Sequence, residues 1–152
     1  MMQSIYCCTT NGKADTVIND QLSIINMKQI ISLAAASGML AVALGAFGAH
    51  VLKGMITPDM LEVYKTGVQY HFYHTFALLV VGILMHFNSS KELEWSARLF
   101  VTGIALFSGS LYALSISGIK ILGVITPFGG VVWIIAWILL AIHCSRITKN
   151  KA

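Results

Sequence analysis

Three histidines, His50, His71 and His74, are the residues of this sequence with the most distinctive chemistry. Neutral imidazole is a common ligand of zinc, copper and haem iron. His71 and His74 have the i, i+3 spacing that places two side chains on one face of a helix, and His50 ends a run of small residues, 44–50. If the helices that carry them are neighbours, His50 and His74 could supply two ligands to one metal or haem.

A structural role is the alternative for these histidines, because His, Tyr, Ser and Thr side chains often hydrogen-bond between membrane helices. No acidic residue or cysteine joins them as a further ligand, or as the acid that usually orients a ligand histidine. Cys7 and Cys8 are adjacent and Cys144 is far away, so no Cys-x-x-Cys motif is present. We therefore expect no catalytic residue, metal or cofactor, and predict one polar cluster that consists of His50, Tyr70, His74, Ser110, Tyr112 and Thr126.

The composition indicates that lipid surrounds the elements that carry these residues. Hydrophobic residues make up 57% of the 152 residues and charged residues 11%, whereas a soluble domain has about 25% charged residues. Mean hydropathy is +0.77. Four segments without a full charge are long enough to cross a bilayer: 30–52, 70–87, 99–119 and 121–144. The sequence therefore predicts an all-α fold, a four-helix transmembrane bundle that forms one domain over residues 27–152.

A short amphipathic helix is predicted to lead into the second span. Thr57-Pro58-Asp59 has the order of a helix N-cap, a proline in the first turn and an acidic residue. A second proline, Pro127, lies near the start of the fourth span, where it either begins that helix or breaks its first turn.

Small residues predict where helix backbones approach closely. They recur every four residues in the first span and again in the third, and two glycines follow Pro127. The residues predicted to form packing surfaces are Ala41, Gly45, Gly48, Ala49, Gly109, Gly129 and Gly130.

The basic residues orient the four spans. With four crossings, both termini and the middle loop lie on one side, which would carry seven Lys and Arg residues against three on the other side. Cytoplasmic loops of membrane proteins carry this excess, so both termini are predicted to be cytoplasmic. The three histidines would then lie near the outer membrane surface, with Tyr112 and Thr126 at a similar depth.

Residues 1–26 differ from the rest of the chain because they are polar and rich in turn-forming residues, without a sustained apolar period. Such a segment does not bury enough apolar surface to fold. We predict a disordered extension here. Met27 and Lys28 directly before the first apolar run indicate that the natural start is Met27.

No Asp or Glu lies inside a span, and the motifs of hydrolases, zinc proteases and nucleotide-binding proteins are absent. Three functions remain open: a non-enzymatic structural or assembly protein of the membrane, a small channel or transporter with the outer His/Tyr cluster as its mouth, and a haem- or metal-binding redox subunit. The expected partners are the lipid bilayer and either other membrane proteins or further copies of the chain. The basic residues form no stripe of the kind that binds nucleic acid.

Several ordered motifs resemble one family of small membrane proteins. They are Gly-Ala-Phe-Gly-Ala-His at 45–50, Tyr70 with His74-Thr75, Phe-Ser-Gly-Ser-Leu-Tyr at 107–112, and Thr126-Pro127 followed by Gly129-Gly130. Over about residues 27–146 the chain is similar to the uncharacterised family known as domain of unknown function 423, YgdD-like or transmembrane protein 256-like. His71 stands where the family pattern has glutamine, which leaves His50 and His74 as the matching histidines. The resemblance implies a four-helix integral protein of the bacterial inner membrane and no particular activity.

Overall fold

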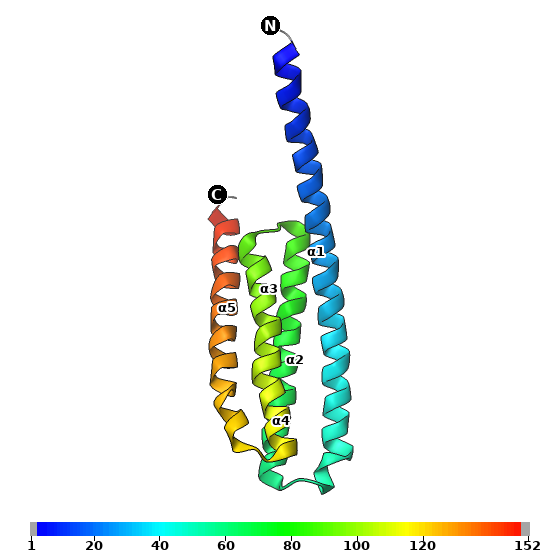
Figure 1. Cartoon of the computed structure of the whole chain (residues 1–152), viewed down its shortest axis with the longest axis vertical. Helices are drawn as coiled ribbons and strands as arrows, with labels where there is room; N and C mark the ends of the chain where they lie inside the picture. The colour runs from blue at the N-terminus through cyan, green and yellow to red at the C-terminus, as the bar shows by residue number, and fades with distance from the viewer. Residues whose placement is uncertain (1–2, 150–152) are drawn as a thin grey trace.

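A computed structural model describes residues 27–146 of the chain, and these residues form helices and short connections without a strand. The long elements are α1 (Gln3–His50), α2 (Pro58–Phe87), α3 (Lys91–Gly103), α4 (Gly109–Ser117) and α5 (Thr126–Lys149) (Figure 1). Three short helices connect or interrupt them: η1 (Leu52–Gly54), η2 (Ile104–Ser108) and η3 (Lys120–Val124). The extension predicted to be disordered, 1–26, lies outside the described residues.

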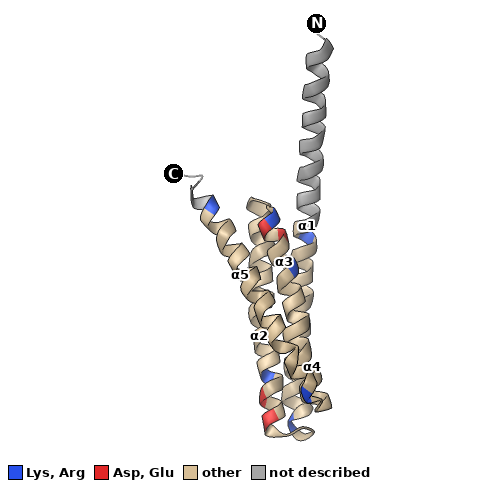
Figure 2. Cartoon of the chain, turned by 60° about the vertical axis from the view of Figure 1, so that its left-hand side comes forward, with Lys and Arg blue, Asp and Glu red and all other residues tan. Residues whose placement is uncertain are grey.

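Four helical segments of the described chain are long and apolar enough to cross a membrane: Met27–Gly54, Pro58–Phe87, Lys91–Ser117 and Lys120–Arg146. The predicted all-α fold with four spans is therefore confirmed. Neighbouring spans run antiparallel (Figure 1). Charged residues lie toward the two ends of the bundle (Figure 2). Helix α1 packs mainly against α2, α2 also contacts α3 and α4, and α3 packs against α5.

The second span begins twelve residues before its predicted start at Tyr70, because the lead-in and the span form one helix of 30 residues. Thr57 caps this helix by accepting a hydrogen bond from the backbone N–H of Met60 at 3.4 Å, and Pro58 occupies its first position. The amphipathic lead-in is thus the first part of the spanning helix. His71 and His74 consequently lie near the middle of α2, and not near an outer surface as expected.

Helices α1 and α2 meet along a seam in which a glycine on one helix faces a larger residue on the other. Gly38 faces Thr75, Gly45 faces Val68, and Gly82 faces Ile31. From one of these contacts to the next, the position on α1 advances by seven residues and the position on α2 goes back by seven. A repeat of seven residues is the period of a left-handed pair of helices.

This seven-residue period corrects the packing stripe predicted for the first span. Ala34, Ala41 and Gly48 are buried at intervals of seven, whereas Ala49 is exposed. Residues spaced by four advance about 40° around an α-helix at each step. A stripe with that spacing therefore rotates off the contact face within a few turns, and Ala49 points away from α2.

The third span contains a π-helical turn, η2, that was not predicted. A π-turn holds one more residue than an α-turn and so changes the direction in which the following residues face. Gly109 follows this turn, and a Cβ added there would meet nothing within 4 Å. The predicted packing role of Gly109 is therefore not seen. Gly118 ends the span with a φ of 73°, a left-handed conformation that favours glycine.

The fourth span begins with η3, and its α-helix starts at Thr126 with Pro127 in the first turn. Of the two roles considered for Pro127, the structure shows the one in which it begins the helix. A Cβ added to Gly129 would lie 2.6 Å from the backbone nitrogen of Phe107, whereas at Gly130 the nearest atoms are 4.0 Å away. Gly129 is thus the point where α5 touches the backbone of η2.

We expect Gly129→Ala to destabilise the bundle by about 1–3 kcal/mol, because the new methyl group would overlap backbone atoms that cannot move without shifting a helix. Gly109→Ala is the matched control, since its methyl group enters open space and alanine favours a helix. Thermal unfolding in detergent measures both. Equal transition temperatures for the two variants would contradict the close contact at Gly129.

Candidate functional site

A chain of polar side chains joins three helices near the middle of the bundle. Ser37 of α1 lies 2.9 Å from Nε2 of His71 and 2.7 Å from the hydroxyl of Thr75, both on α2. Nδ1 of His71 lies 3.2 Å from the hydroxyl of Tyr112 on α4. We call these four residues, Ser37, His71, Thr75 and Tyr112, the central network. Its imidazole uses both ring nitrogens, so one side chain links α1 to α4.

The protons of the central network can be arranged so that every group in it is paired. If Tyr112 donates to Nδ1 of His71, then Nε2–H donates to Ser37, and Ser37 donates to Thr75. The reverse order of donors also satisfies each contact. His71 is only 3% exposed, and a buried polar group without a partner is costly in hydrocarbon. The network therefore meets the hydrogen-bonding needs of His71 without water.

Tyr112 of this network and the neighbouring Tyr64 each fit against a glycine. A Cβ on Gly48 would lie 2.6 Å from the Tyr64 ring, and a Cβ on Gly67 would lie 2.9 Å from the Tyr112 ring. The two rings are 5.0 Å apart between centroids. The Tyr64 hydroxyl donates to the backbone carbonyl of Leu44 on α1 at 2.9 Å. The absence of a side chain at Gly48 and Gly67 thus lets these rings pack between the helices.

His74 lies in a second environment, formed by aromatic rings of α2, α3 and α5. Its ring stacks on Trp133 with centroids 3.4 Å apart and planes inclined by 1°. Its Nδ1–H donates to the carbonyl of Tyr70 at 2.8 Å, which fixes the proton on Nδ1 because a carbonyl only accepts. Trp133 in turn donates from Nε1 to the carbonyl of Phe100 at 3.3 Å. A Cβ on Gly103 would overlap the Trp133 ring.

The residues of the predicted polar cluster therefore lie in several separate contacts and do not form one cluster. Ser110 and Thr126 bond to each other at 2.8 Å and join α4 to α5. Tyr112 belongs to the central network, and Tyr70 and His74 lie against Trp133. His50 is exposed at the end of α1 and belongs to none of these contacts.

The proposed ligand pair of His50 and His74 is not formed. Because Gly38 faces Thr75 across the seam, His74 lies at the level of about residue 39 of α1, some 16 Å along the helix from His50 at about 1.5 Å per residue. Among the described residues, no three His, Cys, Asp or Glu side chains come together as a metal site. The arrangement is that of hydrogen-bonded packing, and it brings no set of ligands together.

The predicted cluster did not include Ser37, Thr75 and Trp133, and it left out His71 although that residue was considered as a ligand. His71 was set aside because glutamine was expected there, although either side chain can both donate and accept. A signal was present in the spacing: His71 and Thr75 are four residues apart and share a helix face, and that face meets the small-residue face that carries Ser37.

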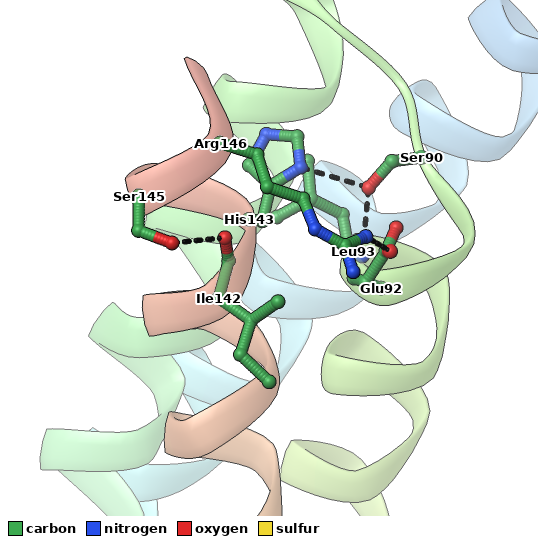
Figure 3. Close-up of polar contacts among 7 residues, drawn as sticks. All are labelled: Ser90, Glu92, Leu93, Ile142, His143, Ser145 and Arg146. Carbon is green, nitrogen blue, oxygen red and sulfur yellow. Dashed lines mark hydrogen bonds and ion pairs between the residues drawn. The ribbon is translucent and has the colours of Figure 1, made fainter. Parts of the chain in front are cut away.

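A third group of contacts joins α3 to α5 (Figure 3). It lies at the end of the bundle that holds residues 27 and 146, the first and last described residues. Ser90 caps α3 by accepting from the Leu93 N–H at 3.3 Å, and its hydroxyl lies 2.8 Å from Nδ1 of His143. Arg146 forms an ion pair with Glu92. We call Ser90, Glu92, His143 and Arg146 the end latch. The Ser90 hydroxyl can accept from Leu93 and still either donate to His143 or accept from it, depending on which ring nitrogen of His143 carries the proton.

These features define the chain as an all-helical, multi-pass membrane protein in which several buried polar groups are bonded between spans. It belongs to the family described as "Protein of unknown function (DUF423)", whose pattern matches residues 44–130. The expected family resemblance is thus confirmed. The match extends from the small-residue run of α1 to the glycines of α5.

Curated relatives of this chain are also described as membrane proteins. The chain is 50% identical over 121 residues to "UPF0382 membrane protein YwdK" of Bacillus subtilis, covering 79% of this chain and 98% of that protein. It is 47% identical over 116 residues to "UPF0382 membrane protein SAB0533" of Staphylococcus aureus, covering 76% and 94%. No solved structure matches the chain. These comparisons support an integral membrane protein of unknown molecular function and point to no enzymatic activity.

We expect His71→Leu to lower the stability of the bundle by about 1–3 kcal/mol, because it removes the partner of Ser37 and Tyr112 inside the bundle. His71→Gln should keep most of this stability, since an amide can donate and accept. His50→Leu, at an exposed position, is the control and should change little. Thermal unfolding in detergent compares all three, and an effect of His50→Leu as large as that of His71→Leu would contradict the assignment.

Loss of the Ser90 hydroxyl should open the end latch. Ser90→Ala removes the cap of α3 and the partner of His143 together, and we expect a cost of about 1–2 kcal/mol. Ser145→Ala is the control, because that hydroxyl bonds only the carbonyl of Ile142 in its own helix (Figure 3). Hydrogen exchange of the first turn of α3 should rise in Ser90→Ala alone. Unchanged exchange there would show that the latch does not hold the helix.

Proposed function

We propose that this chain is a non-enzymatic, multi-pass protein of the bacterial cell membrane with a structural or assembly role. The observation that carries the proposal is the central network, in which every group that could take part in acid–base or ligand chemistry bonds another helix. His74 is similarly held by the Tyr70 carbonyl and the Trp133 ring. In this arrangement the polar groups stabilise the bundle and leave no open reactive set at its centre.

The first span supports an assembly role because the smallest share of its residues is buried by the rest of the bundle. Over its most apolar window, 11% of the residues are buried, against 44% for the second span. Helix α1 packs mainly on α2, and it exposes large side chains such as Met39 and Val42 on its other faces. In the membrane these faces meet lipid or the helices of other proteins.

The distribution of charge supports an orientation with both termini in the cytoplasm. Arg146 pairs with Glu92 at the start of α3, and Gln29 lines the same groove as Met85 and Glu94, so both described ends lie toward the loop between α2 and α3 (Figure 1). This side carries the larger share of Lys and Arg, as cytoplasmic sides do.

The other two functions considered receive less support from the geometry. A channel with the histidines at its mouth would need them at one end of the bundle, whereas His71 and His74 lie near the middle of α2 and are 3% and 7% exposed. A redox subunit would need a set of ligands that come together around a metal, and among the described residues no three His, Cys, Asp or Glu side chains do so.

A photo-crosslinking amino acid at Met39 of α1 should capture protein in native membranes, because this face lacks a neighbour within the chain. The same probe at Ile138, an exposed position of the fourth span, is the comparison and should capture less protein, because more of that span is already covered within the chain, 22% against 11%. An adduct of twice the 16.5 kDa chain mass would identify a second copy. If both positions capture only lipid, the assembly role is wrong.

A further inference from the structure

A groove of about 440 Å³ opens on the side of the bundle between α1 and α3, with α2 as its floor. Leu33 of α1, Leu78 of α2 and Val101 of α3 form an apolar part, whereas Gln29 and Arg98 are polar lining residues. The groove exists because α1 packs on α2 and makes few contacts with α3. Its volume is within the range of about 300–1,000 Å³ that is usual for small-molecule sites.

Two charges of opposite sign lie along one wall of this groove. Glu94 and Arg98 are four residues apart on α3, so they share a face of the helix and are separated by about 6 Å along its axis. Arg98 is the deeper of the two, about 10 Å along the helix from Lys91. The ion pairs seen within residues 27–146 join Lys65 to Glu62 and Arg146 to Glu92, so Glu94 and Arg98 form none with each other.

The environment of Arg98 favours an anion. Its guanidinium lies 5.3 Å from the centroid of the Trp95 ring, and it remains exposed in the groove. An arginine inside a membrane span usually reaches toward the interface and binds a phosphate or a carboxylate there. Arginine is suited to phosphate because its planar donors match two phosphate oxygens.

We propose that this groove binds a phospholipid with an ethanolamine headgroup. In such a lipid the phosphate lies next to the glycerol, and the ammonium group lies farther from the acyl chains. Arg98 would hold the phosphate, Glu94 would hold the ammonium group nearer the end of the bundle, and one acyl chain would lie along Leu33, Leu78 and Val101. The order of charges from the middle of the bundle outward is the order of charges in the lipid.

Competing occupants differ in their charges. A headgroup with an anionic phosphate and no ammonium group would leave Glu94 facing the lipid without a cation. A choline headgroup carries a quaternary ammonium that donates no N–H hydrogen bond to Glu94. A helix of a second copy would need to place apolar side chains against Arg98. The charge pair thus selects ethanolamine among these occupants.

Native mass spectrometry of the full chain in detergent tests the proposal with three lipids of identical acyl chains: phosphatidylethanolamine, phosphatidylglycerol and phosphatidylcholine. We expect one phosphatidylethanolamine to be retained with about tenfold preference. Arg98→Gln should weaken all three lipids, and Glu94→Gln should remove the preference for ethanolamine while leaving phosphate binding. Glu62→Gln, at the other end of α2, is the matched control and should keep wild-type binding.

Leu33→Trp keeps both charges and fills the apolar part of the groove, so it should reduce retention of phosphatidylethanolamine about tenfold. Equal retention of the three lipids by every variant would show ordinary surrounding lipid and overturn the proposal. Preference for phosphatidylglycerol would also overturn it, as would a lipid-free dimer that Leu33→Trp dissociates. Thermal unfolding of each variant confirms that the comparison is made on folded protein.

Discussion

Hydrocarbon offers no partner to a buried polar group, and the bundle depends on how its helices supply such partners to one another. His71 is the clearest case, because it lies near the middle of the second span and reaches Ser37 on one side and Tyr112 on the other. The position of α1 and that of α4 are therefore set by the two nitrogens of one ring. Ser96 and Trp133 follow the same rule by donating to backbone carbonyls of neighbouring helices.

Close packing in this bundle comes from pairing glycines with rings. Tyr64 fits over Gly48, Tyr112 over Gly67, and Trp133 over Gly103. Each pair lets a large flat side chain lie against a helix backbone, which increases contact where no hydrophobic force drives helices together. The same rings carry hydroxyl or indole groups that bond to the bundle. Packing and hydrogen bonding are thus performed by the same side chains.

Hydropathy was sufficient to predict the four spans, because a continuous apolar segment of this length has few alternatives to a membrane helix. Hydropathy alone placed the second span at 70–87, because residues 58–69 contain charges. The motif Thr57-Pro58-Asp59 did predict a helix start at Pro58, but not that this helix is one with the span. The depth assigned to His71 and His74 was wrong for this reason. The face of α1 that contacts α2 was also only partly predictable. Which small residues lie on that face depends on whether they repeat every four or every seven residues, and the partner helix determines this period.

The candidate site was harder to predict than the fold, because contacts between helices are not visible in a single sequence. The structure places Tyr112 beside His71 and Ser110 beside Thr126, in separate contacts between helices, whereas the prediction placed them in one cluster. Trp133 lacked a signal beyond its place among apolar residues, and its stacking on His74 depends on the space left by Gly103.

The π-turn Ile104–Ser108 divides the third span into two helices in series. Before it, α3 packs chiefly against α5, and after it, α4 packs against α2. One added residue rotates all that follows by about 100°, so the turn lets a single span present different faces to different neighbours. A deletion of one residue here would restore a regular α-helix and misdirect Tyr112, so the length of this short segment is under tighter constraint than the identity of many of its side chains.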